Sequence, residues 1–372
     1  MVDRSDVDGK WLFVDDDDAS AASYRDAFAE ASDPLEIVIA RPSAGRELLL
    51  TGAHPKGVLM DVELSGEAGE HGTGLGLAQD IRALQKSGEI PEYPIIRFAN
   101  IQPVQKNVSG DPASDDLFDD KINKADVGKR RDEFTRRIFG AQTVYEGLLA
   151  FEKGKLDFKQ LFNIDDQRIE EWLHPGLLSR LEDGHTHATH VAAGAFIRSF
   201  LGPPGLLVGQ HLLITRLGID LESANEHWET IASFAAGFAY TGLGYGFSPR
   251  WWSRGLELAW MSLKSAEGPL GSTPANERAE VLSKELGVEL SALKMPAVSP
   301  GDRPWRWCQL SSEQNPPEFL PVDPKYGVRI TPRADLPPWV DPIYASIGIA
   351  LRNKEDRRLN RRDLDRLAAE LR

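Results

Sequence analysis

Trp11–Asp18 reads WLFVDDDD and is the segment most informative about the fold. A short run of apolar residues ends here abruptly in consecutive aspartates. An apolar run of this length is typical of a strand that is buried on both faces of a parallel sheet. The aspartates mark the point where that strand leaves the core. The sequence therefore predicts a buried strand with carboxylates at its carboxyl end.

Similar apolar runs recur through the first third of the chain, and segments with helical spacing separate them. The further strands are predicted at residues 35–40, 57–60 and 94–99, with a weaker one at 117–122. The helices are predicted at residues 19–31, 43–51 and 76–86. Alternating strands and helices indicate an open parallel sheet with helices on both faces. In such sheets the working site lies at the carboxyl ends of the strands.

Charged residues fall at three of these strand ends. Asp15 and Asp16 follow the first strand, Asp61 follows the third, and Lys124 follows the fifth. Carboxylates that share one crevice repel one another, and a divalent cation with oxygen ligands relieves that repulsion. A lysine ammonium suits a phosphoryl oxygen, and a carboxylate can itself accept a phosphoryl group. The residues at these ends therefore suit a Mg²⁺ site that handles phosphoryl groups.

The pattern resembles the receiver domain of two-component response regulators over about residues 10–127. The matching segments, in chain order, are WLFVDDDD at 11–18, GVLMDVELSG at 57–66, PIIRFAN at 94–100 and FDDKINKAD at 118–126. They correspond to the first, third, fourth and fifth strands of the family. The resemblance implies a flavodoxin-like, doubly wound, parallel five-stranded sheet.

The resemblance also implies a role for each charged residue. Asp61 would be the phosphoacceptor, and Asp15, Asp16 and Asp61 would hold Mg²⁺. Lys124 would contact the phosphoryl oxygens, although Lys121 is close enough in sequence to rival it. The implied partner is a histidine kinase or a phosphotransfer protein.

Two positions depart from the family pattern. Ala99 stands at the end of the fourth strand, where receivers usually carry Ser or Thr. Asn100 follows it and is a candidate hydrogen-bond donor to the phosphoryl group. Ala125 replaces the proline that usually follows the lysine. The usual conformational switch is therefore in more doubt than phosphorylation, and a degenerate receiver that acts as a binding module stays open as an alternative.

Charge is concentrated in the first third of the chain. The 372 residues carry a net charge of −14. Residues 1–126 hold 25 acidic and 12 basic side chains, so the remainder is close to neutral. This asymmetry places a domain boundary near residue 127. An acidic body repels phosphate backbones, so nucleic acid is not expected as a partner.

Other features of the composition restrict the class of protein. The single cysteine, Cys308, excludes an internal disulfide and a cysteine-based zinc site. The first residues have no apolar signal region. The longest uncharged stretch, residues 230–249, is too polar and too rich in glycine for a membrane span. A cytoplasmic protein without a membrane segment is expected.

The rest of the chain resembles no family. Residues 127–153 are predicted to form a basic linking helix that could serve a homodimer, and residues 154–372 a mainly α-helical output or docking domain. The segment 276–294 has the outline of a helix-turn-helix, but its second half carries one basic residue, Lys294. A recognition helix needs a basic surround. A plain helical hairpin is the favoured interpretation.

A histidine-rich segment supplies the rival hypothesis. DGHTHATH at 183–190 contains His185, His187 and His190. A metal site there, with Asp183, His211 or His227 as further ligands, would make the protein a phosphorylation-regulated effector enzyme. The helical spacing of a zinc peptidase motif is missing. A polar loop leading into a helix is therefore the favoured interpretation.

The sequence thus favours a response regulator that accepts a phosphoryl group on Asp61. Its C-terminal module would serve protein interaction or phosphate buffering. Receiver proteins that act as phosphate sinks, for example in antiphage two-component systems, are similar in outline. Whether the C-terminal module is an enzyme is left open.

Overall fold

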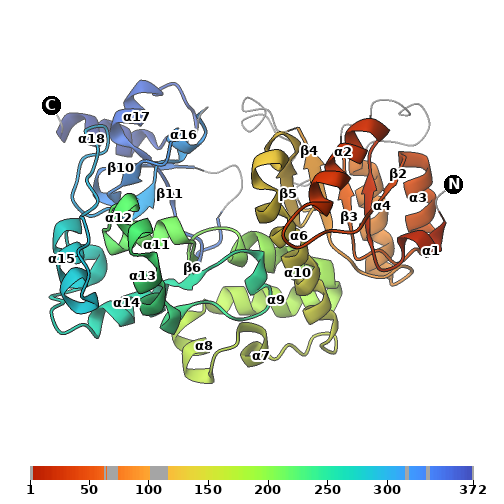
Figure 1. Cartoon of the computed structure of the whole chain (residues 1–372), viewed down its shortest axis with the longest axis horizontal. Helices are drawn as coiled ribbons and strands as arrows, with labels where there is room; N and C mark the ends of the chain where they lie inside the picture. The colour runs from red at the N-terminus through yellow and green to blue at the C-terminus, as the bar shows by residue number, and fades with distance from the viewer. Residues whose placement is uncertain are drawn as a thin grey trace. The chain divides into compact units, whose positions relative to one another are not determined.

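The chain forms two compact units (Figure 1). The computed structural model describes residues 3–62, 64, 74–100, 116–314, 318–331 and 336–370. The first unit extends to Gly202 and also includes Thr241–Ser248. The second unit consists of Pro203–Tyr240 and the residues from Pro249 onward. The domain boundaries predicted after residues 126 and 153 stay predictions, because compactness alone does not say which segments fold independently.

The first unit is built on a parallel five-stranded sheet. Its strands are β1 (Trp11–Val14), β2 (Ile37–Ala40), β3 (Gly57–Met60), β4 (Ile95–Ala99) and β5 (Asp120–Asn123). Their order across the sheet is β2-β1-β3-β4-β5, and every neighbouring pair is parallel. This order defines the flavodoxin-like doubly wound fold. The predicted fold class is confirmed, and the fifth strand begins later than predicted.

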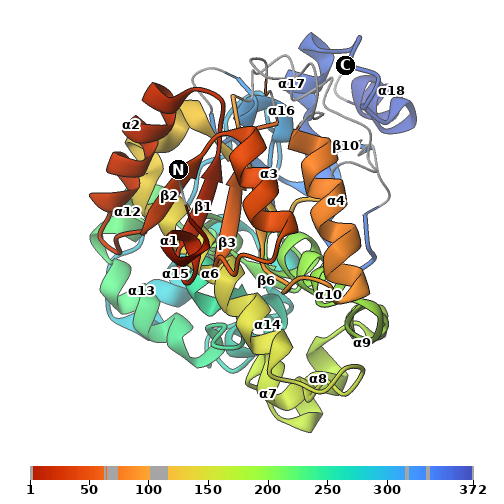
Figure 2. The same cartoon turned by 90° about the vertical axis from the view of Figure 1, so that its right-hand side faces the viewer.

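Helices cover both faces of the sheet (Figure 2). α2 (Asp18–Ala29) and α6 (Val127–Leu149) pack together on one face, and α3 (Pro42–Leu50) packs beside α4 (Gly74–Ser87) on the other. A short helix, α1 (Arg4–Val7), precedes β1. The sheet is therefore buried between two helical layers.

The alternation of side chains along β1 explains why both faces are apolar. Leu12 and Val14 belong to the core that also contains residues of α3 and α4. Phe13 points to the opposite face, where its ring meets Phe98 edge-on at 5.0 Å and Phe98 in turn contacts Phe28 of α2. Successive residues of a strand point to opposite faces, so a strand covered on both sides must be apolar throughout.

The predicted linking helix forms, and it also belongs to the sheet's own layers. α6 buries Phe134 and Ile138. Its Gln142 accepts a hydrogen bond from the indole of Trp11, and Arg137 forms an ion pair with Asp120 of β5. The helix therefore covers the sheet along most of its length.

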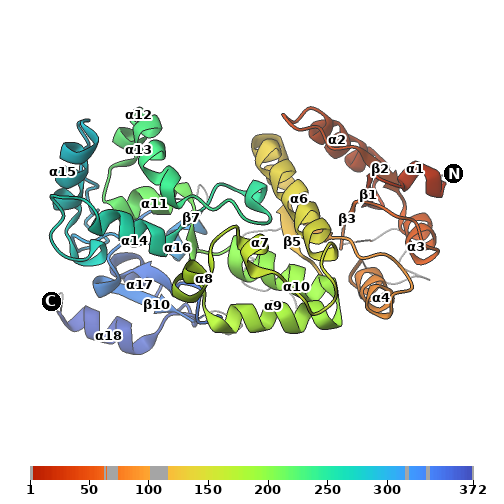
Figure 3. The ribbon, with the colours of Figure 1, turned by 90° about the horizontal axis from the view of Figure 1, so that it is seen from below.

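The first unit continues with helices that extend this layer. They are α7 (Phe158–Phe162), α8 (Asp166–Trp172), α9 (Pro175–His187) and α10 (Thr189–Phe196), which a π-helical turn prolongs over Ile197–Leu201. α9 packs along α10, and α10 packs on α6 (Figure 3). The polar loop predicted at 183–190 is wrong, because α9 runs to His187 and only Ala188 separates it from α10.

The second unit is mainly helical, as predicted. Its helices are α11 (Gln210–Leu217), α12 (Leu221–Glu226), α13 (Trp228–Ala235), α14 (Ser253–Met261), α15 (Ala275–Leu286), α16 (Gln309–Ser312), α17 (Ile347–Arg352) and α18 (Arg361–Glu370). Its antiparallel strand pairs are β6 (Leu207–Val208) with β7 (Trp251–Trp252), β8 (Arg306–Trp307) with β9 (Pro321–Val322), and β10 (Gly327–Ile330) with β11 (Ile343–Ser346).

The predicted helical hairpin at 276–294 is wrong. α15 ends at Gly287, whose positive φ of 70° is the left-handed conformation that commonly ends helices. The following residues run extended, and Ala292 forms a bridge with Ile219. Because the backbone around Ala292 pairs with the chain near Ile219, it does not form the hydrogen bonds of a second helix. Within the described parts of the chain, none of the helices has the length and apolar character needed to cross a membrane.

Candidate functional site

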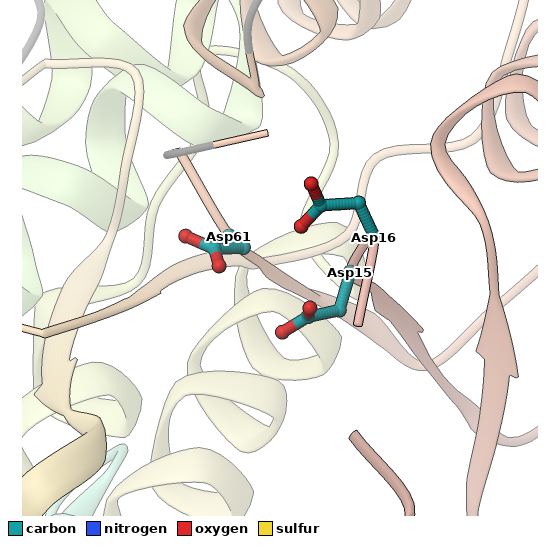
Figure 4. A group of neighbouring side chains, drawn as sticks. All are labelled: Asp15, Asp16 and Asp61. Carbon is teal, nitrogen blue, oxygen red and sulfur yellow. The ribbon is translucent and has the colours of Figure 1, made fainter. Parts of the chain in front are cut away.

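The aspartates predicted to act together lie at one edge of the sheet. Asp15 follows β1 and Asp61 follows β3, and these two strands are neighbours with Val14 opposite Met60. Figure 4 shows the carboxylates of Asp15, Asp16 and Asp61 turned toward a common space. One oxygen from each lies within 4.8 Å of the others. The predicted cluster is therefore assembled.

Lys124 connects the two buried carboxylates of this cluster. Its Nζ donates hydrogen bonds of 2.6 Å to Oδ2 of Asp15 and of 2.6 Å to Oδ2 of Asp61. Lys124 is the first residue after β5, whereas Lys121 lies within that strand opposite Arg97. The contact to Asp61 is thus made by Lys124, the lysine that the family pattern favoured.

The site is closed off from water on its inner side. Asp15 is 1% exposed, Lys124 6% and Asp61 7%. The ammonium lies 5.7–5.9 Å from the ring centres of Phe13, Tyr24 and Phe98. An ammonium beside aromatic faces is attracted by their negative charge distribution. The lysine is therefore held by two carboxylates and by three neighbouring aromatic rings.

Burial sets the protonation behaviour of the site. Loss of water raises the pKa of Asp15, although hydrogen bonds from Lys124 and from the backbone N–H of Asp17 act in the opposite direction. Burial alone would lower the pKa of Lys124, but its hydrogen bonds to Asp15 and Asp61 outweigh that effect and the pKa is raised. The lysine therefore stays charged at neutral pH and compensates the buried carboxylates.

One of the two departures from the family pattern, Ala99, lies at the end of β4. Ala99 is buried opposite Asn123 in the sheet register and has no hydroxyl to offer. Asn100 is exposed immediately after the strand, and its role as a phosphoryl ligand stays a prediction. Most of the glycine-rich loop after Asp61 lies outside the described residues.

Gly74 is a site residue that sequence reasoning missed. A Cβ at this position would lie 2.0 Å from the carbonyl oxygen of Asp61. Such a distance is far below any real contact, so a side chain here would displace the backbone that follows Asp61 or the start of α4. The sequence does show glycines at 72, 74 and 76, but this pattern alone does not indicate which of them contacts the Asp61 backbone.

The histidines of the rival hypothesis have other contacts. Gly154 donates its N–H to Nδ1 of His185 at 3.1 Å, so Nε2 carries the proton and donates to the carbonyl of Leu148 at 2.9 Å. His187 is exposed, and Nδ1 of His190 lies 3.2 Å from a carboxylate oxygen of Glu92. Over the described ranges, the group of metal-binding side chains that assembles is the aspartate trio and not these histidines.

Comparison with solved structures finds only weak similarity, at 14–18% identity and TM-scores below 0.3. A CheY-like receiver domain from Methylobacillus flagellatus is 18% identical over 32% of this chain and 86% of its own, with a TM-score of 0.25. A Vibrio cholerae chemotaxis protein of the CheY type is 16% identical over 36% of this chain and 99% of its own, with a TM-score of 0.26. A structure described as an adenylate cyclase from Rhodopirellula baltica is 14% identical over 39% of this chain and 100% of its own, with a TM-score of 0.28.

No protein-family model and no curated protein matches the chain. The flavodoxin-like fold is therefore assigned from the strand order and the parallel pairing alone. The site can hold a hard cation on carboxylate oxygens and can present a carboxylate and an ammonium to a phosphoryl group.

Proposed function

We propose that the first unit accepts a phosphoryl group on a carboxylate oxygen of Asp61, from a histidine kinase or a phosphotransfer protein. The observation that carries this proposal is the ammonium of Lys124 bridging the carboxylates of Asp15 and Asp61, each at 2.6 Å. An ion pair that only stabilised the fold would not need three carboxylates at the strand ends. A phosphoacceptor site does need this excess of oxygen ligands beside a cation.

The donor set fits Mg²⁺. Oxygens of Asp15, Asp16 and Asp61 approach within 4.8 Å of one another, and Mg²⁺ prefers a few carboxylates together with water and phosphate oxygens. Bound there, the ion would neutralise charge on the phosphoryl oxygens. Asp16 is only half-buried, so a ligand can reach the trio from solvent.

In the transfer itself, an oxygen of Asp61 forms a bond to phosphorus while the phosphorus–nitrogen bond of the donor histidine breaks. The donor imidazole keeps the electron pair and takes up a proton from water. Lys124 holds its proton throughout and places a positive charge against the new phosphoryl oxygens, which is the electrostatic support that such transfers need. The product is an acyl phosphate on Asp61.

The proposal is tested by chemical phosphorylation of the full chain. Acetyl phosphate and Mg²⁺ should add the mass of one phosphoryl group to the wild type and to Asp18→Asn. The addition should be absent in Asp61→Asn and in the presence of a chelator. Asp18 is a matched control because it lies in the same acidic run but is exposed and paired with Arg41. Equal labelling of Asp61→Asn would refute the proposal.

We also propose that the second unit either binds a protein partner or has no separate output, in which case the protein acts as a phosphate buffer in the cytoplasm. Support comes from residues 287–294, which do not form the second helix that a helix-turn-helix at 276–294 would need. Ala99 favours buffering, because the position has no hydroxyl to follow the phosphoryl group. Association that changes on addition of beryllofluoride, measured by light scattering, would favour the docking role.

A further inference from the structure

A cavity of about 300 Å³ lies within the second unit, remote in sequence from the aspartate site. Most of its wall is apolar and comes from proline, aliphatic and aromatic side chains, the last being Trp307, Phe319 and Tyr344. The rings of Trp307 and Phe319 meet edge-on with centres 6.0 Å apart. The volume and the lining are typical of a small-molecule site.

The polar part of this wall is a charged pair. Arg306 and Asp341 both line the cavity, and their side chains form an ion pair at 2.8 Å. Asp341 also pairs with Arg216, which is 3% exposed and lies behind it. Two guanidinium groups thus share one carboxylate, and this part of the wall carries a surplus positive charge.

The hydrogen bonds of the two arginines are incomplete. Nε of Arg306 and Nε of Arg216 are both buried, and neither has a partner among the residues that the structure describes. Buried donors are almost always satisfied, and an exception calls for a missing acceptor. Burial also lowers the pKa of Arg216 to about 10, as expected for a cation without full compensation.

Arg278 is a further buried arginine of this unit, and its Nη2 likewise has no partner among the described residues, so what distinguishes Arg306 is its place on the cavity wall. Arg278 is fully buried and donates to the backbone carbonyls of Thr273, Arg216 and Pro304. Its role is to tie backbone segments together. Arg306 makes one such bond, to the carbonyl of Trp305, and otherwise faces Asp341. Of the two, Arg306 is the arginine that lines the cavity.

We propose that this cavity binds a small organic anion with an aromatic or aliphatic body. The carboxylate or phosphate end of the ligand would pair with Arg306, completing the charge balance that Asp341 provides only in part. The body would lie among Trp307, Phe319 and Tyr344. Binding needs both the anionic end and the apolar body of the ligand. Inorganic phosphate leaves the apolar part of the cavity unfilled, and a neutral aromatic molecule provides no anion for Arg306.

The test is calorimetric titration of the full-length protein with benzoate and phenyl phosphate as probes. Benzyl alcohol and inorganic phosphate serve as the probes that lack one end. At least one aromatic anion should bind the wild type, and Arg306→Gln should weaken that binding by about tenfold or more, as expected for loss of a charge-assisted contact. Arg254→Gln should change nothing, since Arg254 is exposed and pairs with Glu257.

Two further variants guard against misfolding as the cause. Phe319 is 54% exposed, so Phe319→Ala should fold normally and still lose affinity for the aromatic anions. Asp341→Asn should bind the anion more tightly, because it removes the competing carboxylate. The proposal is overturned if neither aromatic anion binds the wild type, if Arg306→Gln binds as well as the wild type, or if benzyl alcohol binds as tightly as the anions.

Discussion

The four aspartates at 15–18 stand side by side in the chain and yet have different partners. Asp15 bonds to Lys124, and Asp16 faces Asp61 across the candidate metal site. Asp17 caps α2 by accepting the backbone N–H groups of Ala19 and Ser20. The run thus supplies both a helix cap, at Asp17, and two residues of the candidate metal site, Asp15 and Asp16.

Lys124 is the residue whose removal should be most costly to the site. Lys124→Met leaves two buried carboxylates without their cation, and loss of one partner of a buried pair costs about 3–5 kcal/mol. The free energy of unfolding, from urea titration in chelator, should fall by that amount. Added Mg²⁺ should restore a large part of it, because the ion supplies the missing charge.

Lys129→Met is the matched control, since Lys129 lies on the same segment but is exposed. It should leave the free energy of unfolding within about 0.5 kcal/mol of the wild type. If the two variants are equally stable in chelator, Lys124 does not compensate the carboxylates.

Asp15 should make cation binding depend on pH. Its raised pKa means that the folded protein holds this proton more tightly than the unfolded chain does. Between the unfolded value, about 3.9, and the raised folded value, this group therefore lowers stability as pH rises, and bound Mg²⁺ opposes that loss. Mg²⁺ affinity should weaken as pH falls through the raised pKa.

Calorimetric titration of Mg²⁺ from about pH 4, the ordinary carboxylate value, up to about pH 8 measures this dependence. Asp15→Asn should bind Mg²⁺ more weakly and show a flatter pH profile. A wild-type profile that follows only the ordinary carboxylate range would contradict the burial argument.

The positions of the charged residues at the strand ends could be predicted because they follow from local pattern. An apolar run followed by a charge is visible in sequence, and parallel strands bring such ends together. Gly74 could not be predicted as a site residue, because its constraint comes from the backbone of Asp61 and not from its neighbours in the chain. The hydrogen bonds of His185 could not be predicted either, because its partners, Leu148 and Gly154, are more than 30 residues away in sequence.

At the scale of elements, a buried polar network joins α4, β5 and α6. Arg82 of α4 pairs with Asp119 at 2.7 Å and donates to the hydroxyl of Tyr145 at 3.0 Å. That hydroxyl bonds Asp119, which also accepts the N–H of Ile95. Partners far apart in sequence form this network, so the sequence could not predict it, and it shows why α6 is fixed to the sheet.

Tyr145→Phe tests how much this network stabilises the first unit. The change removes a hydroxyl bonded to a buried ion pair, and such losses cost about 1–3 kcal/mol. The free energy of unfolding should fall by that amount in urea titration. Tyr93→Phe is the matched control, because the Tyr93 hydroxyl is buried and bonds no described residue. That variant should be neutral or slightly more stable, and the reverse ranking would contradict the network's role.

At the scale of the whole molecule, Thr241–Ser248 is a segment that returns to the first unit from a stretch belonging to the second. Within the first unit it packs on α6, where a Cβ at Gly140 would lie 2.5 Å from Cα of Phe247. It is also bonded to Leu161, whose carbonyl accepts the N–H of Leu243 at 2.7 Å. The two units are therefore interleaved along the chain, which charge asymmetry alone did not indicate.

Gly140→Ala should loosen this segment. The added methyl group meets backbone that must move, and overpacking of this kind costs about 1–3 kcal/mol. Limited proteolysis should then cut within 241–248 faster than in the wild type. Gly128→Ala on the same helix meets nothing within 4 Å and should leave the cleavage rate unchanged. Equal cleavage rates in the two variants would show that Gly140 is not needed for residues 241–248 to pack on α6.

¹⁹F NMR of beryllofluoride bound to the full chain is a direct measurement of whether Asp61 is the Mg²⁺-dependent phosphoacceptor that we propose. Beryllofluoride occupies the place of a phosphoryl group on a carboxylate without any transfer step. We expect bound fluoride signals in the wild type and in Asp18→Asn that require Mg²⁺ and that disappear in Asp61→Asn. No bound signal in the wild type, or an undiminished signal in Asp61→Asn, would contradict this proposal.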